Sequence, residues 1–233
     1  MLNLLLSGKN RIKINTNQIN IIPYNIIRNL NSIIILKEVM FLDLENKKIG
    51  FAITGSFCTF DLIIEEMKKI ALKKADIIPI MSHNSYNMDT KFGNAKDFIE
   101  KIEHITGKQI IHTIQDAEPI GPKKMLDILL IAPCTGNTIS KLANDIVDTT
   151  VTMATKSHLR NEGPVVIAIS TNNGLSSASE NIGKLLNRKN YFFVPFKQDN
   201  PITKPRSVIF DHSYIIRTLE YALDKEQIQP ILL

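Results

Sequence analysis

Residues 47–61, KKIGFAITGSFCTFD, decide the fold class of this chain. Their apolar run Ile49–Ile53 ends abruptly in the small polar residues Thr54–Ser56, and helical spacing of apolar residues begins at Phe60. This pattern predicts a buried strand that enters a helix through a tight turn. Such a turn leaves the first backbone N–H groups of the helix without partners, so it favours a bound phosphate. Glycine and serine are also ordinary turn and cap residues, so turn chemistry alone is the alternative.

A second junction of the same kind follows at residues 127–138. The apolar stretch Asp127–Ile131 predicts another buried strand, and APCTGNT leads from it into a helical pattern that extends to Ile146. Because the carboxyl ends of parallel strands lie on one edge of a sheet, both junctions are expected to face one crevice. Short side chains such as Thr135 and Asn137 both donate and accept hydrogen bonds, which suits a heteroaromatic ring or a ribityl chain better than a metal. The two junctions together favour a nucleotide-like or flavin-like site.

Strands and helices alternate along the rest of the chain, which predicts a single doubly wound parallel sheet, a Rossmann-like or flavodoxin-like three-layer sandwich. Pro79 suggests that its strand lies at an edge of the sheet, because proline cannot donate to a ladder. Asp148 is expected to cap a following helix. Helices are expected at residues 60–73, 94–106, with a stop at Gly107, and 213–224. Strands are expected at residues 76–81, 109–112 and 165–169, and the last strand at 191–195. Residues 82–93 are expected to form a polar loop.

An ordered set of motifs resembles one particular family. Gly55, Ser56 and Cys58 after the first strand, Ser82 after the second, and APCTGNTISKLAND are similar to the flavoprotein superfamily of flavin-dependent cysteine decarboxylases. Within it, the whole series resembles the family of dipicolinate synthase B subunits, from about Lys47 to Leu233. The series reads TGSFCTFD, DTKFG, EPIGPK, IAPCTGNTISKLAN, ISTNNGL, FVPFKQDNP and QIQPILL.

The resemblance implies a cytoplasmic subunit of a sporulating cell that acts with a Rossmann-type A subunit. Together the two would oxidise a dihydrodipicolinate-type precursor to pyridine-2,6-dicarboxylate, with NAD(P) on the partner and FMN as the cofactor of this chain. A homo-oligomer is expected, and no catalytic residue is assigned. The expected cofactor-binding residues are Gly55, Ser56, Cys58, Ser82, Pro133, Thr135, Asn137 and Thr138, and the expected substrate-binding residues are Asn172 and Lys141.

Two departures from the decarboxylase pattern bear on the reaction. The decarboxylases carry a histidine before the second strand-to-helix junction, and the matching position here is Pro119, which cannot transfer a proton. Of their Pro-x-Met-Asn motif only Asn172 remains, whose amide can still hold a carboxylate. Two alternatives to the oxidative reading stay open: a stand-alone FMN-dependent decarboxylase, and a non-catalytic subunit that stabilises its partner.

Composition limits the domain organisation and the partners. The chain of 233 residues has 28 basic and 23 acidic side chains, but residues 1–39 hold five of the basic and one of the acidic ones. Residues 40–233 are therefore nearly neutral, which argues against a nucleic-acid partner, and no apolar run predicts a membrane span. Residues 1–39 are rich in Asn and Ile without a sustained amphipathic period, so we expect a non-native or disordered extension, with Met40 as the hypothetical start of the α/β domain 40–233.

The cysteines and histidines do not predict a metal site. Cys58 and Cys134 fit no metal-binding or redox spacing and are expected to be reduced thiols in the two junctions. The five histidines do not cluster. His104 and His158 are expected on helix surfaces, and His83, in the polar loop, is the one histidine expected near a substrate.

Overall fold

The computed structural model describes residues 5–7, 11–13, 22–23 and 44–233. The chain divides into two compact units, residues 1–42 and 43–233. In the first unit three short antiparallel strands form a sheet: β1 (Leu5–Ser7), β2 (Arg11–Lys13) and β3 (Ile22–Pro23). The expectation for residues 1–39 falls mainly outside the described residues and stays a prediction.

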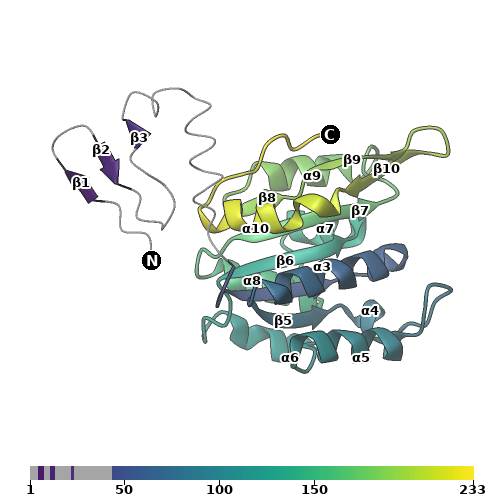
Figure 1. The fold of residues 1–233 in the computed structure, drawn as a ribbon. Helices are drawn as coiled ribbons and strands as arrows, with labels where there is room; N and C mark the ends of the chain where they lie inside the picture. The colour runs from purple at the N-terminus through teal and green to yellow at the C-terminus, as the bar shows by residue number, and fades with distance from the viewer. Residues whose placement is uncertain (1–4, 8–10, 14–21, 24–43) are drawn as a thin grey trace. The chain divides into compact units, whose positions relative to one another are not determined.

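The second unit is built on one mixed sheet of seven strands (Figure 1). The strand order is β5-β4-β6-β7-β10-β9. Strand β8 lies outside this order and pairs with β7. Strands β5, β4, β6, β7 and β8 run parallel, whereas β10 is antiparallel to both β7 and β9. The strands are β4 (Lys48–Ile53), β5 (Asp76–Met81), β6 (Ile128–Cys134), β7 (Val165–Thr171), β8 (Tyr191–Phe193), β9 (Phe196–Asn200) and β10 (Lys204–Phe210).

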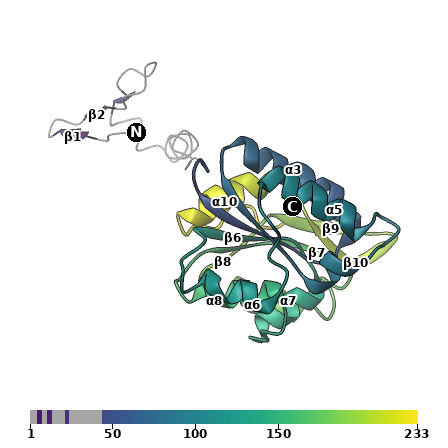
Figure 2. The same ribbon diagram turned by 90° about the horizontal axis from the view of Figure 1, so that it is seen from below.

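Helices cover both faces of this sheet, which explains why its central strands are apolar almost throughout (Figure 2). On β6, Leu130 joins one apolar cluster and its neighbour Leu129 the other, because successive side chains of a strand point to opposite faces. One face carries α3 (Phe60–Leu72), α5 (Ala95–Thr106) and α10 (Ile215–Leu223); the other carries α6 (Ile114–Ala117), α7 (Gly136–Ala143), α8 (Thr150–Leu159) and α9 (Ser179–Leu186). None of the helices in the described part of the chain has the length and apolarity that a bilayer crossing needs.

The predicted α/β class and the single sheet with helices on both faces are confirmed, but the prediction of an entirely parallel sheet is wrong. The expected last strand, 191–195, is followed by the antiparallel hairpin of β9 and β10. Sequence analysis missed this hairpin because KQDN and KPRS are largely exposed and carry no apolar alternation.

Several local expectations can be compared with the structure. Strand β5 has the predicted bounds and lies at the edge of the sheet, as Pro79 suggested. Helix α5 ends at Gly107 in the left-handed conformation, with φ 65°. The strand expected at 109–112 is wrong, since only an isolated bridge between Ile80 and Ile111 forms there. The expected loop 82–93 contains a short helix, α4 (His83–Asn87).

The segment after α7 also differs from expectation. The helix ends at Ala143, and Ile146 lies beyond it with 47% of its surface exposed. Helix α8 is capped by Thr149 through a reciprocal capping box with Thr152. The cap predicted at Asp148 is therefore wrong, and its carboxylate instead pairs with Lys141.

Candidate functional site

The two predicted junctions meet at the carboxyl ends of β4, β6 and β7, where they line a cavity of about 870 Å³. The β4 junction contributes Gly55–Thr59 through the short helix η1 (Phe57–Thr59), and the β6 junction contributes Thr135–Asn137. Residues 170–173 at the end of β7 complete this side. Of the expected site residues, the cavity brings together Gly55, Ser56, Cys58, Thr135, Asn137 and Asn172.

Thr54, which sequence analysis did not single out, joins the two junctions. Its side chain is buried, its Oγ1 donates to the carbonyl oxygen of Pro133 at 2.7 Å, and the N–H of Thr135 donates to the same Oγ1 at 3.0 Å. A hydroxyl can both donate and accept, so one Thr side chain holds both loops in register. The only sequence signal was its position immediately after a buried strand.

The hydroxyl of Ser56 bonds to a third strand, and within its own helix it contacts only the Sγ of Cys58, at 3.9 Å. Ser56 precedes η1 but makes no side-chain cap bond there. Its Oγ lies 2.8 Å from the Oγ of Ser170, which is 8% exposed at the end of β7. Turn capping is therefore not the role of this side chain, and the hydroxyl pair links β4 to β7 at the wall of the cavity.

Thr135 opens α7 by capping it. Its Oγ1 accepts the N–H of Thr138 at 3.4 Å and lies 3.2 Å from the Thr138 hydroxyl. Gly136 follows, and a Cβ at this residue would lie 2.5 Å from the Oγ1 of Thr171 and 2.6 Å from the Oδ1 of Asn173. The close approach of this loop to the end of β7 therefore requires glycine, and it directs the N-terminus of α7 toward the cavity.

Four expected site residues do not line the cavity. Ser82 caps α4 by accepting the Ser85 N–H, Pro133 is buried in β6, and Thr138 is 8% exposed beneath the α7 cap. These three support the loops that line it. Lys141 lies elsewhere, and its Nζ is 2.6 Å from the Asp148 carboxylate.

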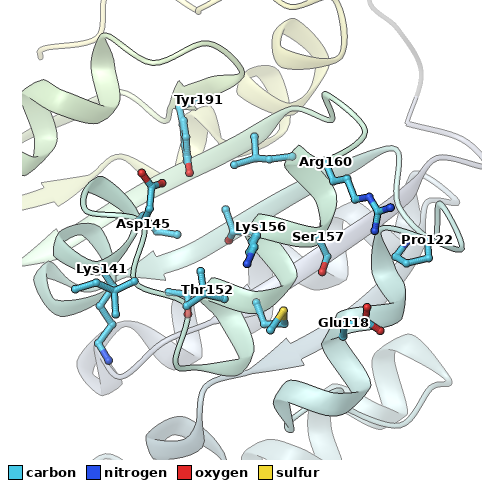
Figure 3. A pocket seen from close by; sticks show the side chains of 15 residues that line it. Glu118, Pro122, Lys141, Asp145, Thr152, Lys156, Ser157, Arg160 and Tyr191 are labelled. Atoms are coloured by element: carbon cyan, nitrogen blue, oxygen red, sulfur yellow. The ribbon is translucent and has the colours of Figure 1, made fainter.

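Lys141 lines a second cavity of about 740 Å³ over α7 and α8 (Figure 3). Tyr191 enters it from the start of β8, and burial raises the pKa of its hydroxyl to about 12. Asp145 also lines this cavity, and two guanidinium nitrogens of Arg188 donate to its carboxylate oxygens at 2.8 and 3.1 Å. The substrate role expected for Lys141 thus finds no support from the cavity that contains Asn172.

Asn172 lies where its amide can serve a ligand. Its Oδ1 accepts from the Ser207 hydroxyl at 3.4 Å, and no hydrogen bond of its NH₂ group is seen within the described residues. The facing walls come from two segments that sequence analysis did not assign to the site, the 91–92 turn and the β9–β10 hairpin. Parts of both lie in motifs of the family resemblance, DTKFG and FVPFKQDNP, but these motifs gave no sign that the segments approach the two junctions, which are far away in the sequence.

The cysteines and histidines were predicted with mixed success. Cys58 is exposed in the cavity, whereas Cys134 is fully buried, and burial raises the pKa of its thiol. No metal-binding group of His, Cys, Asp or Glu occurs among the described residues. His83 is exposed on α4 and does not line the cavity. The surface position expected for His158 is wrong: it is 3% exposed and its Nε2 lies 3.1 Å from the Pro164 carbonyl oxygen.

Comparison with known proteins places the chain in a family. The model of the Flavoprotein family matches residues 41–212. The chain belongs to the Flavoprotein family. This flavoprotein-family chain is 42% identical over 189 residues to the B subunit of dipicolinate synthase from Bacillus subtilis (strain 168), covering 81% of the chain and 94% of that relative.

Solved structures agree with this assignment. The crystal structure of the dipicolinate synthase B subunit from Bacillus halodurans C is 41% identical to the flavoprotein-family chain, with a TM-score of 0.76 over 82% of this chain and 98% of that one. The FMN-dependent cysteine decarboxylase SpaF is 22% identical, with a TM-score of 0.57 over 77% of this chain and 98% of that one, and shares the fold.

Proposed function

We propose that this chain is the B subunit of a dipicolinate synthase. It would act with a Rossmann-type A subunit to oxidise a dihydrodipicolinate-type precursor to pyridine-2,6-dicarboxylate, in the cytoplasm of a sporulating cell. The observation that carries the proposal is the cavity where both strand-to-helix junctions meet Asn172, in a chain 42% identical to a B subunit over most of its length. A homo-oligomer, and NAD(P) held by the partner, belong to the same proposal.

The proposed cofactor of this chain is FMN, and the residues present fit it. A volume of about 870 Å³ lies in the range of cofactor pockets. A Cβ at Gly55 would meet only the Phe57 ring, at 3.5 Å, so this residue leaves room for a phosphate next to the η1 N-terminus. Ser56, Thr135 and Asn137 supply donors and acceptors for a ring or ribityl chain. Bound flavin supplies a two-electron acceptor, as the partner's nicotinamide also would.

The chain's own residues would bind and orient the substrate. Asn172 would donate its amide N–H to a substrate carboxylate, since its Oδ1 is already engaged by Ser207. Phe57 and Phe92 line the cavity and would exclude water from one side of a planar ring. The oxidation removes two hydrogens and forms an aromatic ring, so placing the substrate is the main requirement.

The FMN assignment is tested by Ser56→Asp with Ser179→Asp as the matched control. The first change places an anion where the proposed phosphate lies, and the second places one on the exposed first residue of α9, outside the cavity. In titrations of FMN fluorescence we expect Ser56→Asp to weaken binding at least tenfold, on the order of 1.4 kcal/mol, and Ser179→Asp to leave it unchanged. Equal FMN affinity in both variants at unchanged melting temperature would reject this turn as the phosphate site.

The reaction is tested by mixing the purified chain with the A subunit. The proposal expects dipicolinate formation from the mixture, and a loss of that activity with Ser56→Asp. The stand-alone decarboxylase reading predicts CO₂ release by this chain without its partner. The stabilising-subunit reading predicts that the Ser56→Asp chain restores the partner's activity as well as wild type does.

A further inference from the structure

Two lysines from separate segments line the cavity of the proposed function. Lys91 belongs to the connection between α4 and α5, and Lys204 begins β10. Asp199 is the other charged residue of this lining, so the charged side chains sum to a net positive charge. Sequence analysis placed the substrate cation at Lys141, which faces the second cavity instead.

A tight turn holds Lys91 and Phe92 at its tip. Thr90 and Gly93 exchange backbone hydrogen bonds of 3.0 and 3.1 Å, and the N–H of Phe92 donates to the Thr90 hydroxyl at 3.1 Å. Gly93 has φ +143°, and a Cβ there would lie 2.8 Å from the Phe98 ring on α5. The turn is therefore pressed against a buried helix residue, which limits how far Lys91 can move.

The β9–β10 hairpin positions Lys204 in a comparable way. The Oδ1 of Asn200 accepts the N–H groups of Ile202 and Thr203 at 3.0 and 2.9 Å, which closes the hairpin turn. Lys204 stands opposite Asn200 in the ladder, and its Nζ lies 2.7 Å from the Asp199 carboxylate. This hydrogen bond to Asp199 raises the pKa of Lys204.

We propose that Lys91 and Lys204 each bind one carboxylate of a planar aromatic or near-aromatic dicarboxylate, an assignment that rests on the proposed function. Two cations on separately fixed turns match an anion with two charged ends. The Phe92 ring is 45% exposed and the Lys91 Nζ lies over it at 5.2 Å from its centroid, so a flat ring that contacts Phe92 would lie close to this cation; Asn172 adds an amide donor. A monocarboxylate would use one lysine and leave the other to Asp199 or water.

The second cavity offers the competing site. Lys156 on α8 and Arg160 just after it are exposed and line this cavity together with Glu118 (Figure 3). A dicarboxylate bound there would depend on Lys156 rather than on Lys91 or Lys204. Lys156→Met is therefore both the matched charge control and the test of this alternative.

The experiment measures binding of pyridine-2,6-dicarboxylate and pyridine-2-carboxylate to the full chain by calorimetry, with and without FMN, in buffer free of divalent cations. We expect Lys91→Met and Lys204→Met each to weaken the dicarboxylate about tenfold or more, the usual cost of losing one charged hydrogen bond. The preference for the dicarboxylate over the monocarboxylate should shrink in both variants. Lys156→Met should leave both affinities unchanged.

Asp199→Asn separates recognition from general charge effects. The change releases Lys204 from its exposed ion pair, so dicarboxylate binding should strengthen about two- to fivefold in the wild-type background. In the Lys204→Met background the gain should be smaller, because no lysine is released.

Three outcomes would overturn the assignment: no measurable dicarboxylate binding to the wild-type chain, unchanged affinity in both lysine variants, or a loss with Lys156→Met instead. The FMN titration reports separately on the proposed function, since neither lysine belongs to the two junctions. Dicarboxylate binding without FMN binding would reject the cofactor and keep the lysine assignment. FMN binding together with unchanged dicarboxylate affinity in the lysine variants would keep the cofactor and reject the lysine assignment.

Discussion

Thr54 shows how one buried hydroxyl sets the geometry of the site. Its Oγ1 bonds to both Pro133 and Thr135, residues that follow it by about eighty positions in the sequence. The acceptor of Pro133 has a second donor, the N–H of Thr54 at 3.2 Å, whereas no other acceptor is seen for the N–H of Thr135 within the described residues. The main consequence of losing the hydroxyl is therefore an unpaired N–H at the start of α7.

Thr54→Val should lower the free energy of unfolding by about 1–3 kcal/mol, the cost of a buried donor without a partner, and should also weaken FMN binding. Chemical denaturation and FMN titration measure the two effects. Thr218→Val is the control, because the Thr218 hydroxyl donates to Tyr214 O within its own segment and frees no N–H. An equally large drop in FMN affinity with Thr218→Val would show that the effect comes from a general destabilisation of the protein.

At the scale of elements, the approach of α7 to β7 depends on the absence of a side chain at Gly136. The Thr171 and Asn173 side chains that surround it are themselves joined by a 2.5 Å hydrogen bond from Thr171 Oγ1 to Asn173 Oδ1. A methyl group at this point must displace that pair or move the loop. Either response shifts the wall that carries Asn172.

Gly136→Ala should destabilise the protein by about 1–3 kcal/mol, as overpacking of a tight contact usually does, and should reduce FMN affinity. Gly183→Ala provides the opposite case, since Gly183 lies inside α9 with nothing within 4 Å of a new Cβ. Alanine should there stabilise by up to about 1 kcal/mol through its higher helix propensity. Thermal denaturation of the pair is the measurement, and a stable Gly136→Ala protein with normal FMN binding would contradict the close-contact argument.

At the scale of the whole molecule, the buried His158 ties stability to pH. Burial, opposed by the hydrogen bond with the Pro164 carbonyl oxygen, lowers the pKa of His158 from 6.5 to about 4. Between these values the unfolded chain holds the proton and the folded chain does not, so unfolding takes up a proton and stability falls as the pH drops from 6.5 toward 4.

We expect this histidine to contribute a loss of up to about 3 kcal/mol over that pH range, and none above pH 6.5. Urea denaturation at pH 7.5 and 5 measures it. His158→Gln should be less stable at neutral pH but should lose less stability on acidification than wild type. The same acid dependence in both proteins would assign the effect to other groups.

The unit of residues 43–233 contains both apolar clusters found among the described residues. We therefore propose that a chain of residues 40–233 folds without the preceding segment and keeps the melting temperature and FMN affinity of the full chain. Differential scanning calorimetry of the two forms tests this. A melting temperature several degrees lower for the shorter form would show that residues 1–39 contribute to the fold.

Sequence patterns were enough to predict the parallel core of the sheet and the two junctions at its edge. Strands β4 and β6 are apolar runs followed by small polar residues, and local periodicity and turn chemistry are strong enough there to predict Gly55, Ser56, Thr135 and Asn137 as neighbours, whereas Asn172 was expected from the family resemblance. Tertiary contacts decided the rest. The hydrogen bonds of the Thr54 and Ser56 hydroxyls, the burial of His158, the β9–β10 hairpin and the position of Lys91 and Lys204, rather than Lys141, in the cavity depend on contacts between segments far apart in the chain. Such contacts leave no periodic pattern in the sequence.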